Sequence, residues 1–95
     1  MGKKEIANVL YQHDDILNRY NVKAVFLFGS YARNEQKENS DIDFIMDFKE
    51  PISILEHVKL KDELEGIFGR HIDIVTRKAL KSAISAQILK EAVAL

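Results

Sequence analysis

Hydrophobic positions along the chain change their spacing several times, and each change predicts a new element. Helical spacing over residues 3–20 predicts a first amphipathic helix, whose apolar side is Ile6, Val9, Leu10, Ile16, Leu17 and Tyr20. The apolar run at residues 22–28 is short and rich in β-branched and aromatic residues, which predicts a buried strand at about residues 23–28. Acidic and apolar residues then alternate over residues 41–47, which predicts a second strand with a core side made of Ile42, Phe44 and Met46.

Start and stop signals bound the next helix. Pro51 ends the second strand, and Ser53 followed by Glu56 has the form of a capping box. Gly69 is a natural stop just past the end of the helix. The predicted apolar side of this helix is Leu55, Val58, Leu64, Ile67 and Phe68.

A third strand is predicted at about residues 71–75, and a last helix is predicted from near Thr76, with helical spacing of Leu80, Ile84, Ile88 and Ala92. The alternation of helices and strands predicts an α/β (α+β) fold class, in which helices pack against one small mixed β-sheet. The first two strands are expected to be antiparallel, because this brings the end of one to the start of the other. The intervening helix predicts a parallel crossover between the second and third strands. Residues 1–95 are expected to form a single domain.

Composition excludes several classes of function. The chain contains no cysteine, so disulfides and thiolate metal sites are excluded. It is 46% hydrophobic and 31% charged, as in ordinary globular proteins, and no apolar run approaches the ~20 residues of a membrane span. The N-terminus leads into the first helix and not into a signal sequence, so we expect a cytoplasmic protein without membrane association. The net charge of −1 gives no general electrostatic reason to bind nucleic acid.

The segment with the most specific chemistry begins where the first strand ends, at Gly29 and Ser30. Gly29 permits a sharp bend and lets a ligand approach the backbone without a Cβ atom in the way. Ser30 is expected to cap a short helix over residues 31–35, and the free N–H groups at a helix start suit a phosphate. Taken alone, a Gly-Ser pair is more often only a turn with a helix cap.

Two acids follow a polar loop at residues 35–40. Asp41 and Asp43 occupy alternate positions of the predicted strand, so they project from the same face with Cα atoms about 6.6–6.8 Å apart. Neighbouring carboxylates repel each other unless a cation or a proton intervenes, which favours a divalent metal site. The alternative is that both acids lie on the solvent-facing side of an antiparallel strand.

The run GSYARNEQKENSDIDFIM, from Gly29 to Met46, resembles the signature of the minimal nucleotidyltransferases of the DNA polymerase β superfamily. That signature is Gly-Ser-x-Ala-Arg-Gly, a short loop, and then Ser-Asp-x-Asp with an apolar tail. Asn34 stands where the family usually has glycine, and asparagine tolerates a left-handed backbone better than most residues. A third family acid, on a later strand, is matched by Asp73. The resemblance covers nearly the whole chain.

The resemblance implies a polymerase β-like nucleotidyltransferase fold and assigns roles to these residues. Asp41, Asp43 and Asp73 would be the catalytic and metal-binding residues for two Mg²⁺ ions, and Asp73 would also take the proton of the acceptor. The triphosphate of ATP, or of another nucleoside triphosphate, would be bound by Gly29, Ser30 and Arg33. The implied reaction is in-line attack on the α-phosphate, which transfers a nucleoside monophosphate such as AMP and releases pyrophosphate.

A single small domain has little surface left for a specific acceptor, so we expect self-association into a homo-oligomer or a partner protein. In the resembled family, small enzymes of this kind are often paired with a helical HEPN protein, a toxin-like ribonuclease, and act as antitoxins that adenylylate it. The leading hypothesis is therefore a Mg-dependent transferase that moves AMP to a hydroxyl of a HEPN-type partner. Two alternatives stay open: a non-catalytic antitoxin that acts by contact, and a small-molecule transferase resembling the aminoglycoside-modifying branch.

Overall fold

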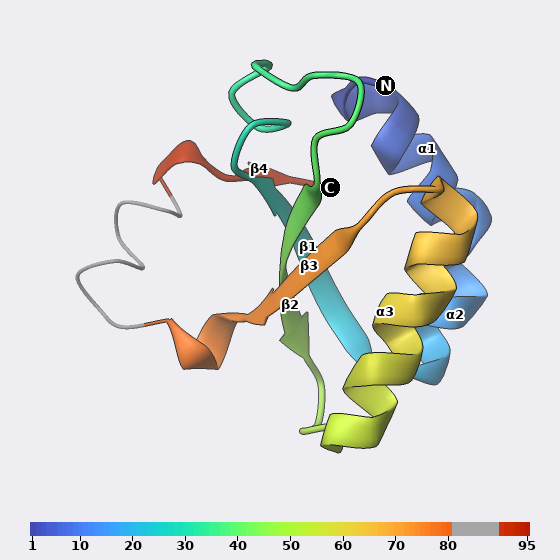
Figure 1. The fold of residues 1–95 in the computed structure, drawn as a ribbon. Helices are drawn as coiled ribbons and strands as arrows, with labels where there is room; N and C mark the ends of the chain where they lie inside the picture. Colours follow the sequence, from blue (N-terminus) through green and yellow to red (C-terminus); the bar gives the residue numbers. More distant parts are fainter. Residues whose placement is uncertain (81–89) are drawn as a thin grey trace.

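The computed structural model describes residues 1–80 and 90–95 of the chain. Its centre is a four-stranded mixed sheet in the order β3-β2-β1-β4, with strands β1 (Val22–Phe28), β2 (Ile42–Phe48), β3 (Ile72–Thr76) and β4 (Val93–Ala94). One side of the sheet carries three helices (Figure 1), which are α1 (Lys3–Gln12), α2 (Asp14–Arg19) and α3 (Ile54–Phe68). A short 3₁₀ helix, η1 (Arg77–Ala79), follows β3. None of the described helices is long and apolar enough to cross a membrane. The predicted α/β fold class with one small mixed sheet is confirmed.

The strand directions agree with the prediction. β1 and β2 are antiparallel, with Phe28 opposite Asp43, and β2 and β3 are parallel, with Asp43 level with Asp73. α3 forms the crossover between β2 and β3. Since β1 ends where β2 and β3 begin, the segments that carry the nucleotidyltransferase-like residues meet at one end of the sheet.

The hydrophobic core lies between the sheet and the helices. Alternate strand positions and one side of each helix supply it, and its buried members include Ile6, Leu10, Ile16, Tyr20, Val25, Leu27, Ile42, Phe44, Met46, Leu60, Leu64 and Phe68. The core side predicted for the second strand is therefore confirmed. The rings of Phe44 and Phe68 lie 6.1 Å apart between centroids, within the range of favourable aromatic pairs.

The ends of α3 are set by local signals, as predicted. The Ser53 Oγ atom accepts a hydrogen bond from the Glu56 N–H at 3.1 Å, and the Glu56 carboxylate accepts one from the Ser53 N–H at 3.3 Å. Gly69 follows the helix in the left-handed conformation, with φ of 66°. Both the capping box and the glycine stop are confirmed.

The predicted apolar side of α3 is wrong in its first half. Leu60, which was not among the predicted positions, is buried with Leu64 and Phe68, and these positions are four residues apart. Leu55 and Val58 lie on the other side of the helix and are exposed. Successive residues of a helix are 100° apart, so only one side of α3 can face the sheet. That side is the one that carries Leu60, Leu64 and Phe68.

The predicted first helix is in fact two helices. His13 leaves the helical conformation, with φ of −121° and ψ of 32°, and its Nδ1 atom lies 2.9 Å from the Val9 carbonyl oxygen. In a continuous helix the Val9 carbonyl would accept the His13 N–H, whereas here it is in contact with the His13 ring and the His13 N–H donates to Leu10. α1 therefore ends at Gln12, and α2 begins at Asp14.

The predicted last helix does not begin near Thr76. η1 ends at Ala79, and Leu80 has an extended backbone with φ of −75° and ψ of 130°. The predicted positions Ile84 and Ile88 lie outside the described residues. Beyond them, the strand β4 follows Ala92 and pairs antiparallel with β1, which the sequence did not predict.

Candidate active site

Tertiary structure brings two of the predicted acids side by side where β1 ends. Asp43 and Asp73 are level in the parallel pair of β2 and β3, and Phe28, the last residue of β1, is opposite Asp43. The third acid, Asp41, lies just before β2 and is exposed. The parallel crossover through α3 is what aligns these acids, which lie about thirty residues apart in the chain.

The pKa of Asp43 reflects how closely the charged groups gather. It is raised from the ordinary value of 3.8 to about 6. Burial is the largest cause, the charge of Asp73 and a hydrogen bond with it come next, and the charge of Asp41 adds to them. The charge of Arg33 lowers the same pKa. The predicted acids Asp41 and Asp73 and the predicted phosphate-binding Arg33 therefore all influence the pKa of the Asp43 carboxyl group.

Gly29 borders the site at the end of β1, and this position requires glycine for two separate reasons. Its φ of 73° lies in the left-handed region, which side chains other than glycine rarely adopt. A Cβ atom at this position would also overlap the carboxylate of Asp43. The predicted bend at Gly29 is confirmed, and its absent side chain makes room for an acid of the site.

The segment after Gly29 is a turn and not the predicted short helix. The Arg33 N–H donates to the Gly29 carbonyl at 3.2 Å, and the Glu35 N–H donates to the Ser30 carbonyl at 2.9 Å. These bonds span four and five residues, so no continuous α-helical ladder forms. Asn34, with φ of 59°, turns the chain out of the helical conformation, which confirms the left-handed backbone expected there. Phosphate binding at Ser30 would therefore rest on the N–H groups of the turn without a helix dipole.

Arg33 is exposed and pairs with two glutamates. Its Nε atom lies 3.2 Å from a carboxylate oxygen of Glu35, and its guanidinium also lies 3.8 Å from Glu91. Exposed ion pairs of this kind contribute only about 0–1 kcal/mol to stability. The guanidinium can therefore exchange them for a phosphate at little cost.

Tyr31 is a positioning residue that sequence reasoning missed. Its side chain is buried, and its hydroxyl accepts a hydrogen bond from the Arg70 Nε atom at 3.0 Å. The same hydroxyl lies 3.4 Å from the Ser40 carbonyl oxygen, to which it donates. One side chain thus ties the Gly-Ser turn to the residue before Asp41 and to the turn before β3. An aromatic residue within a polar stretch was the available sequence signal.

The start of β3 is fixed by an acid from α3. The Glu65 carboxylate accepts a hydrogen bond from the Ile72 N–H at 3.0 Å, and this bond is the main reason why the pKa of Glu65 is lowered. The His71 Nδ1 atom lies 3.4 Å from the same carboxylate. Because Ile72 immediately precedes Asp73, this contact helps to set the position of the site acid.

The donor set suits a divalent cation such as Mg²⁺. Carboxylate oxygens are its preferred ligands, and a bound cation would relieve the repulsion that raises the pKa of Asp43. Within residues 1–80 and 90–95, no group of three or more acidic or histidine side chains is close enough to hold a metal ion by itself. Mg²⁺ usually keeps several water ligands and also binds substrate phosphates, so it needs only one or two protein carboxylates. Two neighbouring carboxylates with a third nearby meet this requirement.

Comparison with known proteins adds independent findings. The family model described as polymerase beta, nucleotidyltransferase, matches residues 4–95. The protein adenylyltransferase MntA of Thermococcus cleftensis is 38% identical over 91 residues, which cover 95% of this chain and 92% of that protein. A solved structure assigned to the minimal nucleotidyltransferases has a TM-score of 0.84 at 34% identity, with 100% of this chain and 97% of the other covered. The complex of a tri-AMPylated Shewanella oneidensis HEPN toxin with its MNT antitoxin shares the fold at a TM-score of 0.68 and 16% identity, with 93% and 69% covered.

Proposed function

The chain belongs to the polymerase β nucleotidyltransferase family, and we propose that it transfers AMP from ATP to a hydroxyl group on a HEPN-type partner protein. Residues 1–95 would act as one nucleotidyltransferase domain with Mg²⁺ as its metal. The observation that carries the proposal is the pairing of Asp43 with Asp73 beside the Gly29 turn. Neighbouring carboxylates can hold a metal ion, and a backbone turn can donate hydrogen bonds to phosphates, and a metal-assisted attack on a triphosphate uses both.

Each part of the site would have its own task. Mg²⁺ held by Asp41, Asp43 and Asp73, as one or two ions, would neutralise the triphosphate and lower the pKa of the acceptor hydroxyl. The Ser30 hydroxyl and the N–H groups of its turn would donate hydrogen bonds to the β- and γ-phosphates. Arg33 would leave its exposed glutamate partners and bind a phosphate oxygen.

The chemical step is an in-line displacement at the α-phosphorus of ATP. The acceptor oxygen forms a bond to that phosphorus, and the bond between phosphorus and the bridging oxygen of the β-phosphate breaks. Pyrophosphate leaves with the electron pair of the broken bond. The proton of the acceptor hydroxyl passes to a carboxylate oxygen of Asp73, so the products are the adenylylated partner and pyrophosphate.

The proposed partner is supported by the relatives. The similar protein from Thermococcus cleftensis is named a protein adenylyltransferase, and the Shewanella oneidensis antitoxin of the same fold is bound to an AMPylated HEPN toxin. The matched regions cover nearly all of this chain. A protein hydroxyl is therefore favoured over an aminoglycoside as the acceptor, and the antitoxin role follows from the nature of the partner.

The direct test combines this protein with α-labelled ATP, Mg²⁺ and a HEPN-type candidate partner, sought first among the products of neighbouring genes. The expected result is an added AMP mass on the partner. The Asp41→Asn/Asp43→Asn double variant, checked for folding by circular dichroism, should give no adduct.

Two outcomes would contradict the proposal. If wild type and double variant neutralise the partner equally and no adduct forms, the protein is an antitoxin that acts by contact. If label moves instead to an aminoglycoside and not to the partner, the small-molecule alternative is correct.

A further inference from the structure

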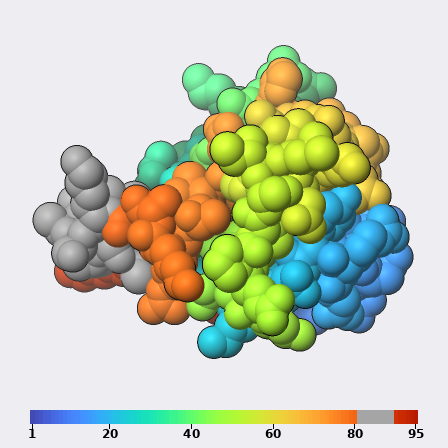
Figure 2. All heavy atoms as spheres, turned by 90° about the horizontal axis from the view of Figure 1, so that it is seen from below, coloured from blue at the N-terminus to red at the C-terminus, as the bar shows by residue number. Residues whose placement is uncertain are grey.

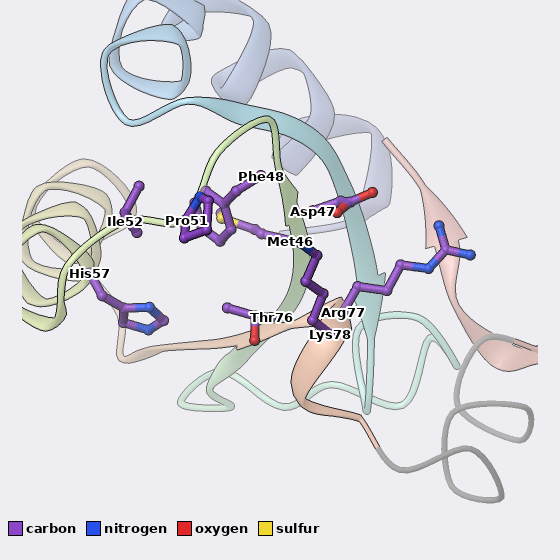
Figure 3. A pocket seen from close by; sticks show the side chains of 9 residues that line it. All are labelled: Met46, Asp47, Phe48, Pro51, Ile52, His57, Thr76, Arg77 and Lys78. Carbon is purple, nitrogen blue, oxygen red and sulfur yellow. The ribbon is translucent and has the colours of Figure 1, made fainter.

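A small pocket lies at the other end of β2 and β3 from the paired acids. Its volume is about 170 Å³, its floor is apolar, and its rim is polar (Figure 3). The floor is formed by Met46, Phe48 and Ile52, and the rim by His57, Thr76 and Lys78. In the close-up view, His57 points from α3 toward Thr76, so both elements contribute to the opening. A pocket of this size accepts one apolar side chain and not a nucleotide.

Beside the pocket, the first turns of α3 expose large apolar side chains. Ile54 is 85% exposed, Leu55 63% and Val58 47%. Residues three and four apart on a helix are neighbours, so Ile54 lies next to both His57 and Val58. Figure 2 looks onto this end of the molecule, where the start of α3 lies beside the residues that follow β3. The pocket therefore continues into the side chains of Ile54 and Val58 as one apolar patch, of the kind that marks protein interfaces. Leu55 is two residues from His57 and projects from the opposite side of the helix.

The lining of the pocket carries two cations and one acid. Lys78 and Arg77 line the pocket together with a single acid, Asp47, and the side chains of Asp47 and Arg77 point away from His57 (Figure 3). Among the described residues, neither Lys78 nor Arg77 takes part in an ion pair.

From this combination we infer that the α3 patch, defined as Ile54, Val58 and the pocket rimmed by His57 and Lys78, docks an acidic segment of the acceptor protein. The segment would place one apolar side chain in the pocket and a carboxylate beside Lys78. This inference rests on the proposed function, since it assigns a surface to the proposed partner. A second copy fits less well, because an isologous contact through the patch would bring the cations of both copies together.

The position of the patch would allow it to hold the acceptor protein close to the active site without covering it. Met46 in the pocket floor lies three residues beyond Asp43 on β2, which is about 10 Å along the strand. A partner held at this end leaves the acid end of the sheet open to a neighbouring segment with the acceptor hydroxyl. Docking away from the reacting atoms keeps the acceptor at high local concentration without blocking ATP.

The test measures binding separately from transfer. Every variant is made in the Asp41→Asn/Asp43→Asn background, which is expected not to adenylylate, and is titrated with a HEPN-type candidate partner, sought first among the products of neighbouring genes. Ile54→Gln and Lys78→Glu should each weaken binding about tenfold or more. The first variant removes an apolar contact that binding would bury, and the second reverses a charge that faces the partner. The matched controls are Tyr11→Gln, an exposed aromatic residue on α1, and Lys4→Glu, and both should bind within about twofold of the unaltered background.

The outcomes separate the two proposals. Equal binding by the Ile54→Gln and control variants, or no binding of the partner at all, overturns the docking proposal. A dimer of the isolated chain that Ile54→Gln dissociates, seen by sedimentation, assigns the patch to a second copy and also overturns it. Partner binding that Ile54→Gln weakens, with no AMP added by the wild-type protein, supports docking and overturns the proposed transfer. Melting curves confirm that each variant is folded, as expected for exposed positions.

Discussion

Replacing Asp43 by asparagine should stabilise the metal-free protein at neutral pH while it abolishes transfer. In the folded chain the pKa of Asp43 is raised from 3.8 to about 6, chiefly by burial and by Asp73. Between about pH 4 and pH 6 the folded state therefore binds more protons than the unfolded state, and the free energy of unfolding falls as the pH rises. Asparagine does not ionise, so the variant escapes this loss.

The size of the effect follows from the shift. About two pKa units correspond to roughly 3 kcal/mol at 1.36 kcal/mol per unit. The carboxyl is half-buried, so solvent screening reduces this figure, and about 1–2 kcal/mol remains. For a chain of this length, that corresponds to a rise in Tm on the order of 5–10 °C.

The assay is thermal unfolding followed by circular dichroism, in chelator-treated buffer of low ionic strength from about pH 4.5 to pH 7.5. The gain in Tm of Asp43→Asn over wild type should grow up to a little above pH 6 and then level off. Asp47→Asn, which removes another carboxylate from the same strand, is the matched control. Added Mg²⁺ should then raise the Tm of wild type more than that of the variant.

A pH-independent difference between Asp43→Asn and wild type would refute the reasoning, since the effect is assigned to one ionisation. A variant that is less stable than wild type at pH 7.5 would also refute it, because the carboxylate would then be stabilised by contacts that the structure does not show.

Substitutions at four further positions test the structure around the site and the start of α3. Gly29→Ala should lower the metal-dependent rise in Tm and the transfer rate together, because its Cβ overlaps the Asp43 carboxylate; unchanged Mg²⁺ binding would contradict this. Asn34→Gly should keep stability and activity, whereas Asn34→Ala should cost about 1–2 kcal/mol in urea unfolding, owing to its φ of 59°. Tyr31→Phe should lose about 1–2 kcal/mol and raise the Mg²⁺ concentration needed for half-maximal transfer, because Arg70 and the Ser40 carbonyl lose their shared partner; an equal loss of stability with no change in Mg²⁺ requirement would make the residue purely structural. Ser53→Ala should destabilise the fold by about 0.5–2 kcal/mol in the same denaturation assay and leave Mg²⁺ binding unchanged.

The sequence by itself determined the features that depend on local chemistry. The capping box at Ser53 and the glycine stop at Gly69 act within one turn of helix, so no distant residue is needed to predict them. Strand alternation at Ile42, Phe44 and Met46 has a fixed period of two, which assigned the core face of β2 correctly. The signature from Gly29 to Asp43 likewise indicated the family, because its residue types and spacing are themselves the signal.

Tertiary structure decided what depends on partners that are distant in the chain. The side of α3 that is buried was set by the sheet, so Leu60 entered the core and Leu55 stayed exposed. β4 is only two residues long and exists through its pairing with β1, and such a short segment has no periodicity to read. The raised pKa of Asp43 is also a tertiary property: burial and the neighbouring Asp73, about thirty positions later in the chain, create it together. Local sequence patterns identify the residues of such a site, whereas long-range packing sets the distances between them and their pKa values.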